Sequence, residues 1–301
     1  MSAPEIIRYF NRYSGRYENE QVYGAGWMRW TYGTSLGRLA LEALVKRPMF
    51  SQWYGWRMDR SRSRNKIAPF IRDFGINTDE FAQPPESFQS FNEFFYRRLK
   101  PGARPIDPDP NCVVFPADGR HLGFPSISGV EAVFVKGQQF NLPRLLGDVD
   151  LAKRYADGAL VLSRLCPVDY HRFHFPAAGL ASRTALLNGL LYSVNPVALR
   201  RNLGYLWENR RTLTRLETER FGQILILEIG ATNVGSIVQT YKPGATASKG
   251  DEKGFFRFGG SSTLVLFEPG RIRLAEDLVH YSRERCELYA RVGDRMGVAA
   301  G

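Results

Sequence analysis

The sequence predicts an α+β protein in which a helical N-terminal portion precedes a β-rich, mainly antiparallel catalytic domain. Apolar residues recur at helical spacing through much of the first hundred residues. Beyond a proline-rich connector at 100–110, short apolar runs bounded by turn residues replace that pattern. We therefore expect a helical N-terminal region at 1–105 and a β-rich domain at 106–301. A chain of 301 residues, 44% of them hydrophobic, can bury a sizeable core.

Amphipathic helices are predicted before the connector. In 34–47 apolar residues follow the i, i+3, i+4, i+7 pattern of a helix with one buried face. The same pattern at 67–74 stops at Gly75, a residue that commonly follows the last helical turn. A further helix begins at the capping box formed by Ser90 and Glu93.

The segment 53–66 combines aromatic rings with positive charge: Trp53, Tyr54 and Trp56 accompany five Lys or Arg residues and one Asp. Tryptophan and tyrosine favour the headgroup level of a bilayer, and clustered cations are attracted to anionic lipid. We expect this patch to contact an anionic phospholipid membrane. A solvated basic helix face is the alternative. RNA binding would also suit such a composition, but no RNP-like or KH-like motif supports a nucleic-acid partner.

Beyond the connector, the sequence predicts a series of short strands. Thr212, Thr214, Leu216 and Thr218 alternate with Leu213 and Arg215, which is the period of a half-buried strand. Turn residues separate most of the runs. The predicted strands lie at 112–115, 131–136, 159–165, 183–192, 210–217, 221–229, 233–240, 262–268 and 270–274.

Net charge, cysteine content and the length of apolar runs limit the kinds of partner and cellular location that we expect. A formal net charge of +11 favours an anionic partner. Three widely spaced cysteines without a CxxC motif indicate a reducing compartment, not a disulfide framework. The N-terminus lacks the pattern of a signal peptide, and no window approaches 18 uncharged apolar residues. We therefore expect no transmembrane helix, and any membrane contact to be peripheral.

A candidate nucleophile stands near the C-terminal end. Ser261 follows Gly259 and Gly260 directly and precedes an apolar run. A plain turn into a strand would explain these residues. A serine hydroxyl at this place can also attack the backbone carbonyl of Gly260, and a side chain in place of the glycine would crowd that step.

Two further segments supply partners for such a serine. Asp118 ends the turn after a short apolar strand, where it can cap the turn or orient an imidazole. His171 and His174 lie three residues apart among aromatic residues, which suits general acid–base work. A zinc site is the alternative, but no cysteine cluster completes it, and we predict no metal. In a strand these histidines would face opposite sides, so a local bend is needed to bring both into one site.

Aspartate, histidine and serine in this chain order are the parts of a Ser-His-Asp relay. One use is hydrolysis, although the G-x-S-x-G elbow of many hydrolases is missing. The other is self-cleavage. In that case the serine forms an ester by an N→O acyl shift, and β-elimination then leaves dehydroalanine, which hydrolyses to a pyruvoyl group.

Several segments, in this order, give the chain a resemblance to the phosphatidylserine decarboxylases from about residue 30 to about residue 270. The sequence departs from the commonest family pattern at Gly259, where leucine often stands, and at Ser262, where threonine often stands. The segments are 94–105 (FFYRRLKPGARP), 116–119 (PADG), 135–137 (VKG), 169–174 (DYHRFH), 192–196 (YSVNP), 208–211 (ENRR), 230–237 (GATNVGSI), 249–256 (KGDEKGFF) and the Gly-Ser-Ser triplet 260–262.

The resemblance implies a self-processing proenzyme, or zymogen. Cleavage between Gly260 and Ser261 would give a β chain of residues 1–260 and an α chain of residues 261–301. Ser261 would become the covalent pyruvoyl cofactor. Asp118 and His174 would activate Ser261 during maturation, and His171 would serve the decarboxylation itself.

The implied reaction converts phosphatidylserine to phosphatidylethanolamine and CO2 in phospholipid biosynthesis. It would run through a Schiff base between the substrate amine and the pyruvoyl ketone. The resemblance further implies a peripheral protein on the cytoplasmic face of the cell membrane, and a homodimer is compatible with it. Three alternatives remain at this point: a different serine-headed lipid as substrate, a soluble amino acid as substrate, and an unprocessed, non-enzymatic lipid-binding relative.

Overall fold

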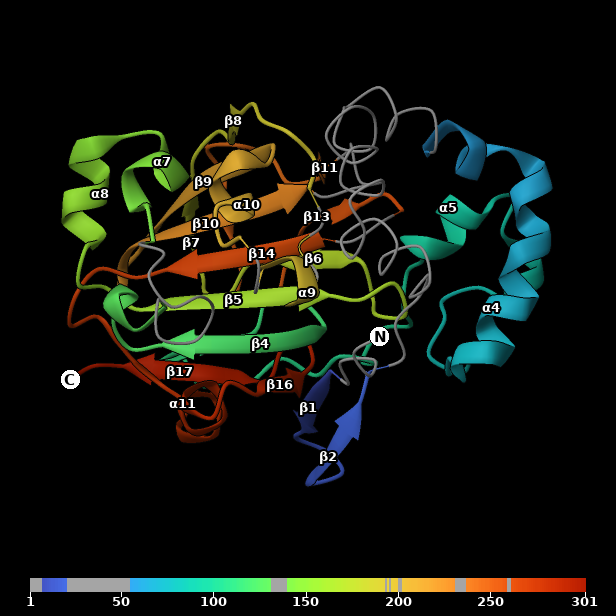
Figure 1. Ribbon diagram of the computed structural model, residues 1–301, viewed down its shortest axis with the longest axis horizontal. Helices are drawn as coiled ribbons and strands as arrows, with labels where there is room; N and C mark the ends of the chain where they lie inside the picture. Colours follow the sequence, from blue (N-terminus) through green and yellow to red (C-terminus); the bar gives the residue numbers. More distant parts are fainter. Residues whose placement is uncertain are drawn as a thin grey trace, which may run out of the picture.

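A large sheet forms the centre of the fold (Figure 1). In the computed structural model, residues 7–20, 55–130, 140–192, 194, 196–199, 202–230, 237–258 and 261–301 are described. The eleven described strands of this sheet run in the order β12-β7-β9-β10-β14-β5-β4-β16-β1-β2, with β8 paired to β9. They are β1 Arg8–Asn11, β2 Arg16–Asn19, β4 Gly119–Phe124, β5 Leu160–Leu165, β7 Gly179–Ala181, β8 Ala185–Leu187, β9 Arg211–Thr218, β10 Gly222–Gly230, β12 Thr246–Ala247, β14 Ser261–Leu266 and β16 Glu287–Ala290.

Strand pairing in the described sheets is antiparallel except between β1 and β16, which run parallel. Two sheets of three strands accompany the large one, in the orders β11-β13-β6 and β15-β17-β3. Their strands are β3 Cys112–Val114, β6 Arg172–His174, β11 Ile237–Gln239, β13 Glu252–Phe256, β15 Ile272–Leu274 and β17 Arg295–Ala299.

Short helices connect and cover the sheets, and local side chains define several of their ends. Ser90 accepts a hydrogen bond from the Glu93 amide at the start of α5, and Gly75 adopts φ 60° at the end of α4. The helices are α4 Ile67–Phe74, α5 Phe91–Phe95, α7 Leu142–Leu146, α8 Val149–Tyr155, α9 Pro196–Leu199, α10 Tyr205–Glu208 and α11 Glu276–Arg283, with 3-10 turns η2 Ser61–Lys66, η3 Pro85–Ser87 and η4 Ile127–Gly129.

The central strands of the large sheet, β5, β10 and β14, are buried on both faces. On one face, leucines of β5, β10 and β14 pack with apolar residues of α7, α8 and α10. On the other face, residues of the same strands pack against β3, β15, β17 and α11. Every residue of β14 is buried in consequence, so the strand that begins at Ser261 lies in the interior.

A separate phenylalanine cluster lies beside one end of the large sheet, where Figure 1 shows α4 and α5. Phe91, Phe94 and Phe95 of α5 are at most 1% exposed and make edge or tilted contacts with neighbouring rings. The cluster also includes Phe258, which lies close before β14 in the chain. The N-terminal region therefore packs directly against the segment that leads into Ser261.

The predicted fold class is confirmed: helices and a large, mostly antiparallel sheet make an α+β structure. The helices at 67–74 and from Ser90 are confirmed, although the second ends at Phe95. Strands are found within or close to the runs predicted at 112–115, 159–165, 210–217, 221–229, 233–240, 262–268 and 270–274.

Some predictions were wrong in detail. The first hundred residues are not wholly helical, because β1 and β2 form a hairpin that joins the large sheet through β16. The run 183–192 contains only the short strand β8. The predicted helix at 34–47 and the strand at 131–136 lie outside the described residues. The domain division at residue 105 stays a prediction. Among the described residues, no helix is both long and apolar enough to span a bilayer.

Candidate active site

Ser261 is the first residue of β14 and lies between two central strands. It is opposite Leu165 of β5 and Gly230 of β10, and its exposed fraction is 0%. Gly260, the other half of the predicted cleavage site, and Gly259 before it lie outside the described residues. The serine hydroxyl is thus shielded from bulk water at the point where the chain enters the sheet.

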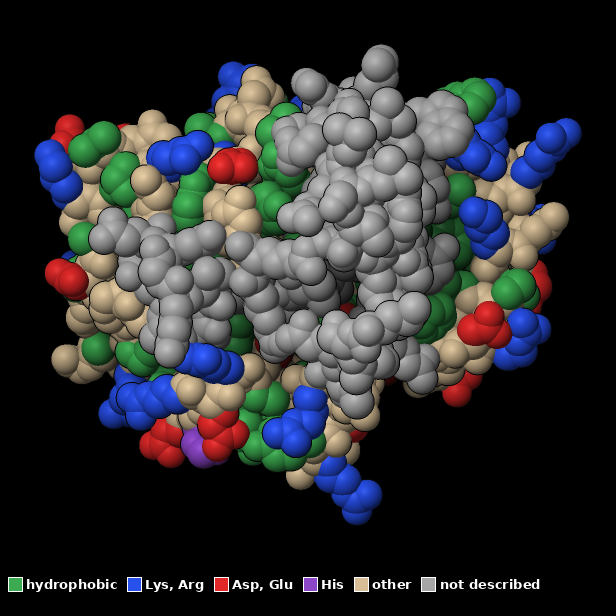
Figure 2. All heavy atoms as spheres, viewed as in Figure 1, with side chains coloured by type: hydrophobic (Ala, Val, Ile, Leu, Met, Phe, Trp, Pro, Cys, Tyr) green, Lys and Arg blue, Asp and Glu red, His purple; other side chains and the backbone are tan. Residues whose placement is uncertain are grey.

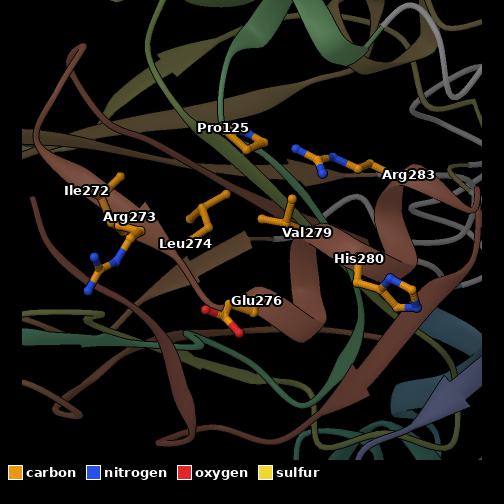
Figure 3. Close-up of a pocket in the computed structure, with 8 residues that line it drawn as sticks. All are labelled: Pro125, Ile272, Arg273, Leu274, Glu276, Val279, His280 and Arg283. Atoms are coloured by element: carbon orange, nitrogen blue, oxygen red, sulfur yellow. The ribbon is translucent and has the colours of Figure 1, made fainter.

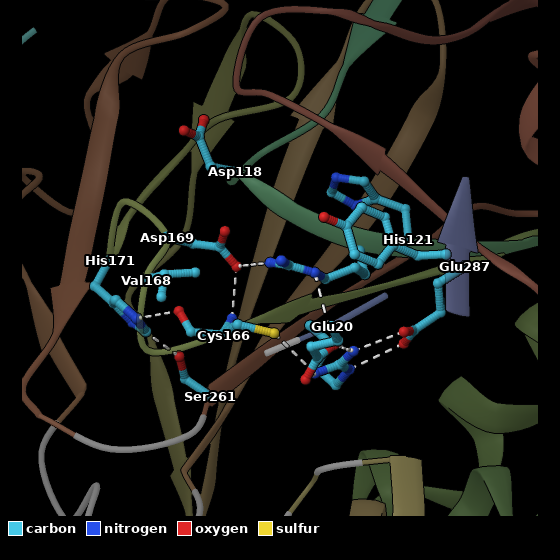
Figure 4. Close-up of polar contacts among 12 residues, drawn as sticks. Glu20, Asp118, His121, Cys166, Val168, Asp169, His171, Ser261 and Glu287 are labelled. Carbon is cyan, nitrogen blue, oxygen red and sulfur yellow. Dashed lines mark hydrogen bonds and ion pairs between the residues drawn. The ribbon is translucent and has the colours of Figure 1, made fainter. Parts of the chain in front are cut away.

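His171 contacts this hydroxyl. Its Nδ1 atom lies 3.3 Å from Ser261 Oγ, and its Nε2 atom lies 2.9 Å from the carbonyl oxygen of Cys166 (Figure 4). A carbonyl can only accept a hydrogen bond, so Nε2 carries the proton and Nδ1 is left as an acceptor. The serine hydroxyl therefore donates to Nδ1.

The His171 ring is held in an apolar, cationic setting. Phe95 stacks on it with 3.8 Å between ring centroids, and the imidazole is fully buried. Burial lowers the pKa of His171 to about 3, with the charge of Arg97 acting in the same direction and the Cys166 carbonyl opposing it. No carboxylate contributes to this balance. His171 is consequently neutral at physiological pH and poorly suited to keep a proton.

The loop before His171 owes its shape to buried charges. Asp169 accepts a hydrogen bond of 2.6 Å from the Cys166 amide and pairs with Arg120. This interaction fixes the backbone at Cys166, whose carbonyl oxygen accepts the hydrogen bond from His171 Nε2 (Figure 4). Asp169 acts on the His171 imidazole through the backbone of Cys166. The sequence did not predict this indirect link.

His174 lies at the end of β6 in a different electrostatic environment. Its Nδ1 donates to the carbonyl oxygen of Gly250 at 2.9 Å, while Nε2 is buried and has no partner in the described part of the chain. Burial, the largest cause, lowers the pKa of His174 on balance, while the Gly250 hydrogen bond and the charges of Glu252 and Asp118 act in the opposite direction. This second imidazole has a free acceptor nitrogen and two carboxylates that favour its cation.

Asp118 is buried, with an exposed fraction of 1%. Its carboxylate accepts hydrogen bonds from Arg104 Nε and Nη2, the shortest of them 2.6 Å, and Oδ1 also accepts from the Val292 amide at 2.9 Å. Figure 4 shows the carboxylate directed away from Ser261 and His171.

The structure therefore brings His171 and Ser261 into contact, and leaves Asp118 with Arg104. No described hydrogen bond joins Asp118 to an imidazole or His174 to Ser261. Sequence reasoning missed Phe95, Cys166 and Arg104 as parts of this site. Phe95 and Arg104 both lie in the motif at 94–105, which was the available signal.

Two surface hollows differ in their distance from the predicted site residues: one adjoins His174, and the other lies elsewhere. One, of about 400 Å³, is lined by Arg98, Leu99, Tyr170, Thr240 and Glu252. Its Tyr170 ring lies 5.8 Å from the His174 ring, so it adjoins the candidate site. The other, of about 410 Å³, lies over β15 and α11 and contains none of the predicted site residues; Pro125, Leu274 and Val279 are among those that line it (Figure 3).

The basic and aromatic patch is described from residue 55 onward, and Trp53 and Tyr54 lie outside the described residues. Trp56 is 54% exposed, and the guanidinium of Arg60 lies 4.0 Å above its ring. Arg62 and Arg64 are exposed on the following turn η2. Figure 2 shows Lys and Arg side chains on the right-hand side of the molecule, where α4 and α5 lie in Figure 1.

Comparison with known proteins gives concordant matches. The family model described as phosphatidylserine decarboxylase matches residues 91–297. A phosphatidylserine decarboxylase proenzyme of Chlamydia muridarum is 47% identical, with 99% of this chain and 98% of the relative covered. Proenzymes of the same name from Chlamydia pneumoniae and Fusobacterium nucleatum are 44% and 42% identical, with at least 96% of each chain covered.

Proposed function

This chain belongs to the phosphatidylserine decarboxylase family, and on that premise we propose that it converts phosphatidylserine to phosphatidylethanolamine and CO2 with a pyruvoyl group made from its own Ser261. One observation carries the assignment of Ser261 as the nucleophile. The hydroxyl of a fully buried serine, preceded in sequence by two glycines, donates to the Nδ1 atom of His171 over 3.3 Å.

Maturation would begin with attack of Ser261 Oγ on the carbonyl carbon of Gly260. An ester forms as the peptide C–N bond breaks, and the proton of the hydroxyl is transferred to the freed amine by way of an imidazole. A base then removes the Cα hydrogen of residue 261 while the Cβ–O bond breaks and releases the carboxylate of Gly260. Water replaces the nitrogen, which leaves as ammonia, and residue 261 is left as a ketone.

The proton acceptor in maturation is His174, supported by the charge of Asp118. A general base must be stable as a cation during the step. His171 touches the hydroxyl but has no carboxylate near enough to contribute to its pKa, whereas two carboxylates favour protonated His174. His171 accordingly orients the hydroxyl in the precursor and stands beside position 261 in the mature enzyme.

The residues around position 261 fit a pyruvoyl group. At position 261 the acceptor His171 Nδ1 suits the N–H of a substrate amine that meets the ketone there, whereas His174 Nε2, a buried acceptor without a partner in the described residues, makes no described contact with this position. When formed, the group supplies a ketone that takes up the substrate amine and the electrons released with CO2. Phe95 excludes water from the His171 ring, which accepts a hydrogen bond at position 261, and His174 takes up the proton during maturation.

We place the substrate at an anionic membrane on the cytoplasmic face, reached from the side. The exposed Trp56 and the cations of η2 support attachment to such a surface. The hollow lined by Arg98 and Tyr170 adjoins His174 and supports an entry route for the lipid headgroup.

Ser261→Ala tests the proposal. We expect wild-type protein to appear on a denaturing gel as two fragments, the smaller beginning at position 261 with a blocked N-terminus that borohydride reduces. Ser261→Ala should remain one chain without decarboxylase activity, because it has no hydroxyl to attack Gly260. Ser262→Ala is the matched control and should still cleave. A split Ser261→Ala chain would refute this nucleophile.

A further inference from the structure

Arg104, a residue of the proline-rich connector, holds the Asp118 carboxylate from one side. Its Nε lies 3.0 Å and 2.9 Å from the two carboxylate oxygens, and its Nη2 lies 2.6 Å from Oδ2. Both side chains are largely buried, with side-chain exposures of 12% for Arg104 and 2% for Asp118. Hydrogen bonds of this multiplicity to a carboxylate are among the stronger ones in proteins.

Arg104 is itself held in place from the N-terminal region. Its Nη1 donates to Glu80 at 2.9 Å and to the carbonyl oxygen of Ala103 at 2.7 Å. Burial alone would lower the pKa of Arg104, but the hydrogen bonds and charges of Asp118 and Glu80 raise it above its usual range. Arg104 is therefore a permanent cation with a fixed orientation.

We propose that Arg104 is a positioning residue for self-cleavage, whose hydrogen bonds fix the Asp118 carboxylate in the place from which its charge acts on His174. This inference rests on the proposed role of Asp118 in maturation. A buried carboxylate without a cation favours its neutral form, and a neutral Asp118 no longer stabilises protonated His174.

The other groups around Asp118 would not replace Arg104. Arg97 is the second cation whose charge acts on Asp118, but its described hydrogen bonds go to backbone carbonyls, and Asp169 opposes it with a negative charge. Loss of Arg104 would therefore leave Asp118 without a described hydrogen-bonded cation, and with the Val292 amide as its described donor. The titratable groups whose pKa responds to Asp118 are Arg97, Arg104, Asp169, Tyr170, His174 and Tyr289.

The test is the pH profile of self-cleavage. Full-length chains made by cell-free translation would be diluted into buffers from about pH 5.5 to pH 9, and the rate of fragment formation measured. For Arg104→Gln we expect the acidic limb to move to higher pH by at least about one unit, because protonation of the unpaired carboxylate becomes easier. Arg104→Lys keeps the positive charge but not the paired hydrogen bonds. The acidic limb of its pH profile should therefore lie between those of the wild type and Arg104→Gln.

Arg12→Gln is the matched control, since Arg12 binds Asp277 with two hydrogen bonds of 2.8 Å and makes no described contact with Asp118 or His174. It should leave the profile unchanged. A wild-type profile in both Arg104 variants, or a uniform loss of rate without a shift, would overturn the inference. If a thermal melt shows that Arg104→Gln is not folded, the pH profile of Arg104→Lys alone decides whether the inference holds.

The variant Asp118→Asn distinguishes a failure of this inference from a failure of the proposed role of Asp118 in maturation. Normal cleavage of Asp118→Asn would remove Asp118 from maturation and end both. If Asp118→Asn does not cleave, but the pH profiles of the two Arg104 variants are the same as that of the wild type, only the positioning role of Arg104 is refuted.

Discussion

Contact and charge select different histidines in this site. His171 lies against the Ser261 hydroxyl, yet its buried ring has a pKa of about 3 and no carboxylate to support a proton. His174 makes no described contact with the serine, but Asp118 and Glu252 favour its cation. In the proposed mechanism His171, which contacts the serine, orients the hydroxyl, and His174, on which two carboxylates act, takes its proton.

This division predicts different failures of the two histidine variants. His171→Ala should still cleave, though more slowly, and lose at least about 100-fold in decarboxylation, a typical loss for an acid–base group. His174→Ala should remain an uncleaved precursor. Gel analysis measures cleavage, and CO2 release per cleaved chain measures the reaction. The opposite pattern, with His171→Ala uncleaved and His174→Ala cleaved, would exchange the two roles.

At the scale of elements, α5 links the N-terminal region to the reactive strand. Its last residue, Phe95, stacks on His171 and also meets Phe258 edge-on at 4.9 Å. The sequence placed α5 in a helical N-terminal region at 1–105, but the helix packs on the two segments that carry His171 and Ser261. A displacement of α5 would therefore change the surroundings of both His171 and Ser261.

Phe95→Leu should reduce decarboxylation about tenfold while the protein stays folded, because the leucine keeps the apolar volume but not the flat face against His171. Phe88→Leu is the control. Phe88 is 1% exposed in the same cluster, and its described ring contacts are with Phe81 and Phe94. Both variants should lose about 1 kcal/mol of stability in denaturant titrations. Equal losses of activity in the two would contradict a specific role for Phe95.

At the scale of the whole molecule, two buried histidines make stability depend on pH. Burial, the largest cause, lowers the pKa of His121 and of His171 to about 3. A histidine pKa lower in the folded than in the unfolded state stabilises the fold above the unfolded value of about 6.5, and this stability is lost as pH falls toward 3.

We therefore expect the uncleaved Ser261→Ala protein to lose about 2 kcal/mol per buried histidine between pH 7 and pH 5. Urea titration at several pH values measures this change. His121→Asn should reduce the pH slope, whereas a surface variant, His280→Gln, should not. A stability that stays constant from pH 7 to pH 5 would show that these rings do not remain buried and neutral.

Membrane attachment is also a property of the whole surface. Replacing Arg60, Arg62 and Arg64 by Gln should weaken binding to anionic vesicles by about 1 kcal/mol per charge, roughly a hundredfold in all. The same change at Arg183, Arg273 and Arg283, exposed cations elsewhere, should have a smaller effect. Vesicle flotation with and without phosphatidylserine measures both. Equal losses would assign binding to net charge and not to this patch.

The sequence by itself determined the fold class, the family and the order of the reactive segments. Periodicity placed helices at 67–74 and from Ser90, and the motifs located Ser261 and His171, which the structure brings within 3.3 Å. These features are local, because a capping residue or a glycine pair acts on its neighbours in the chain. The strands β1 and β2 escaped prediction because four-residue strands carry little periodicity and depend on pairing with β16.

Only the tertiary structure decided which groups meet across long separations in the chain. Arg104 on Asp118, Phe95 on His171, and Asp169 on the loop that orients His171 all depend on how segments pack. The physical reason is burial. Whether an imidazole is neutral or a carboxylate is paired depends on the water excluded and the charges nearby, and packing sets both.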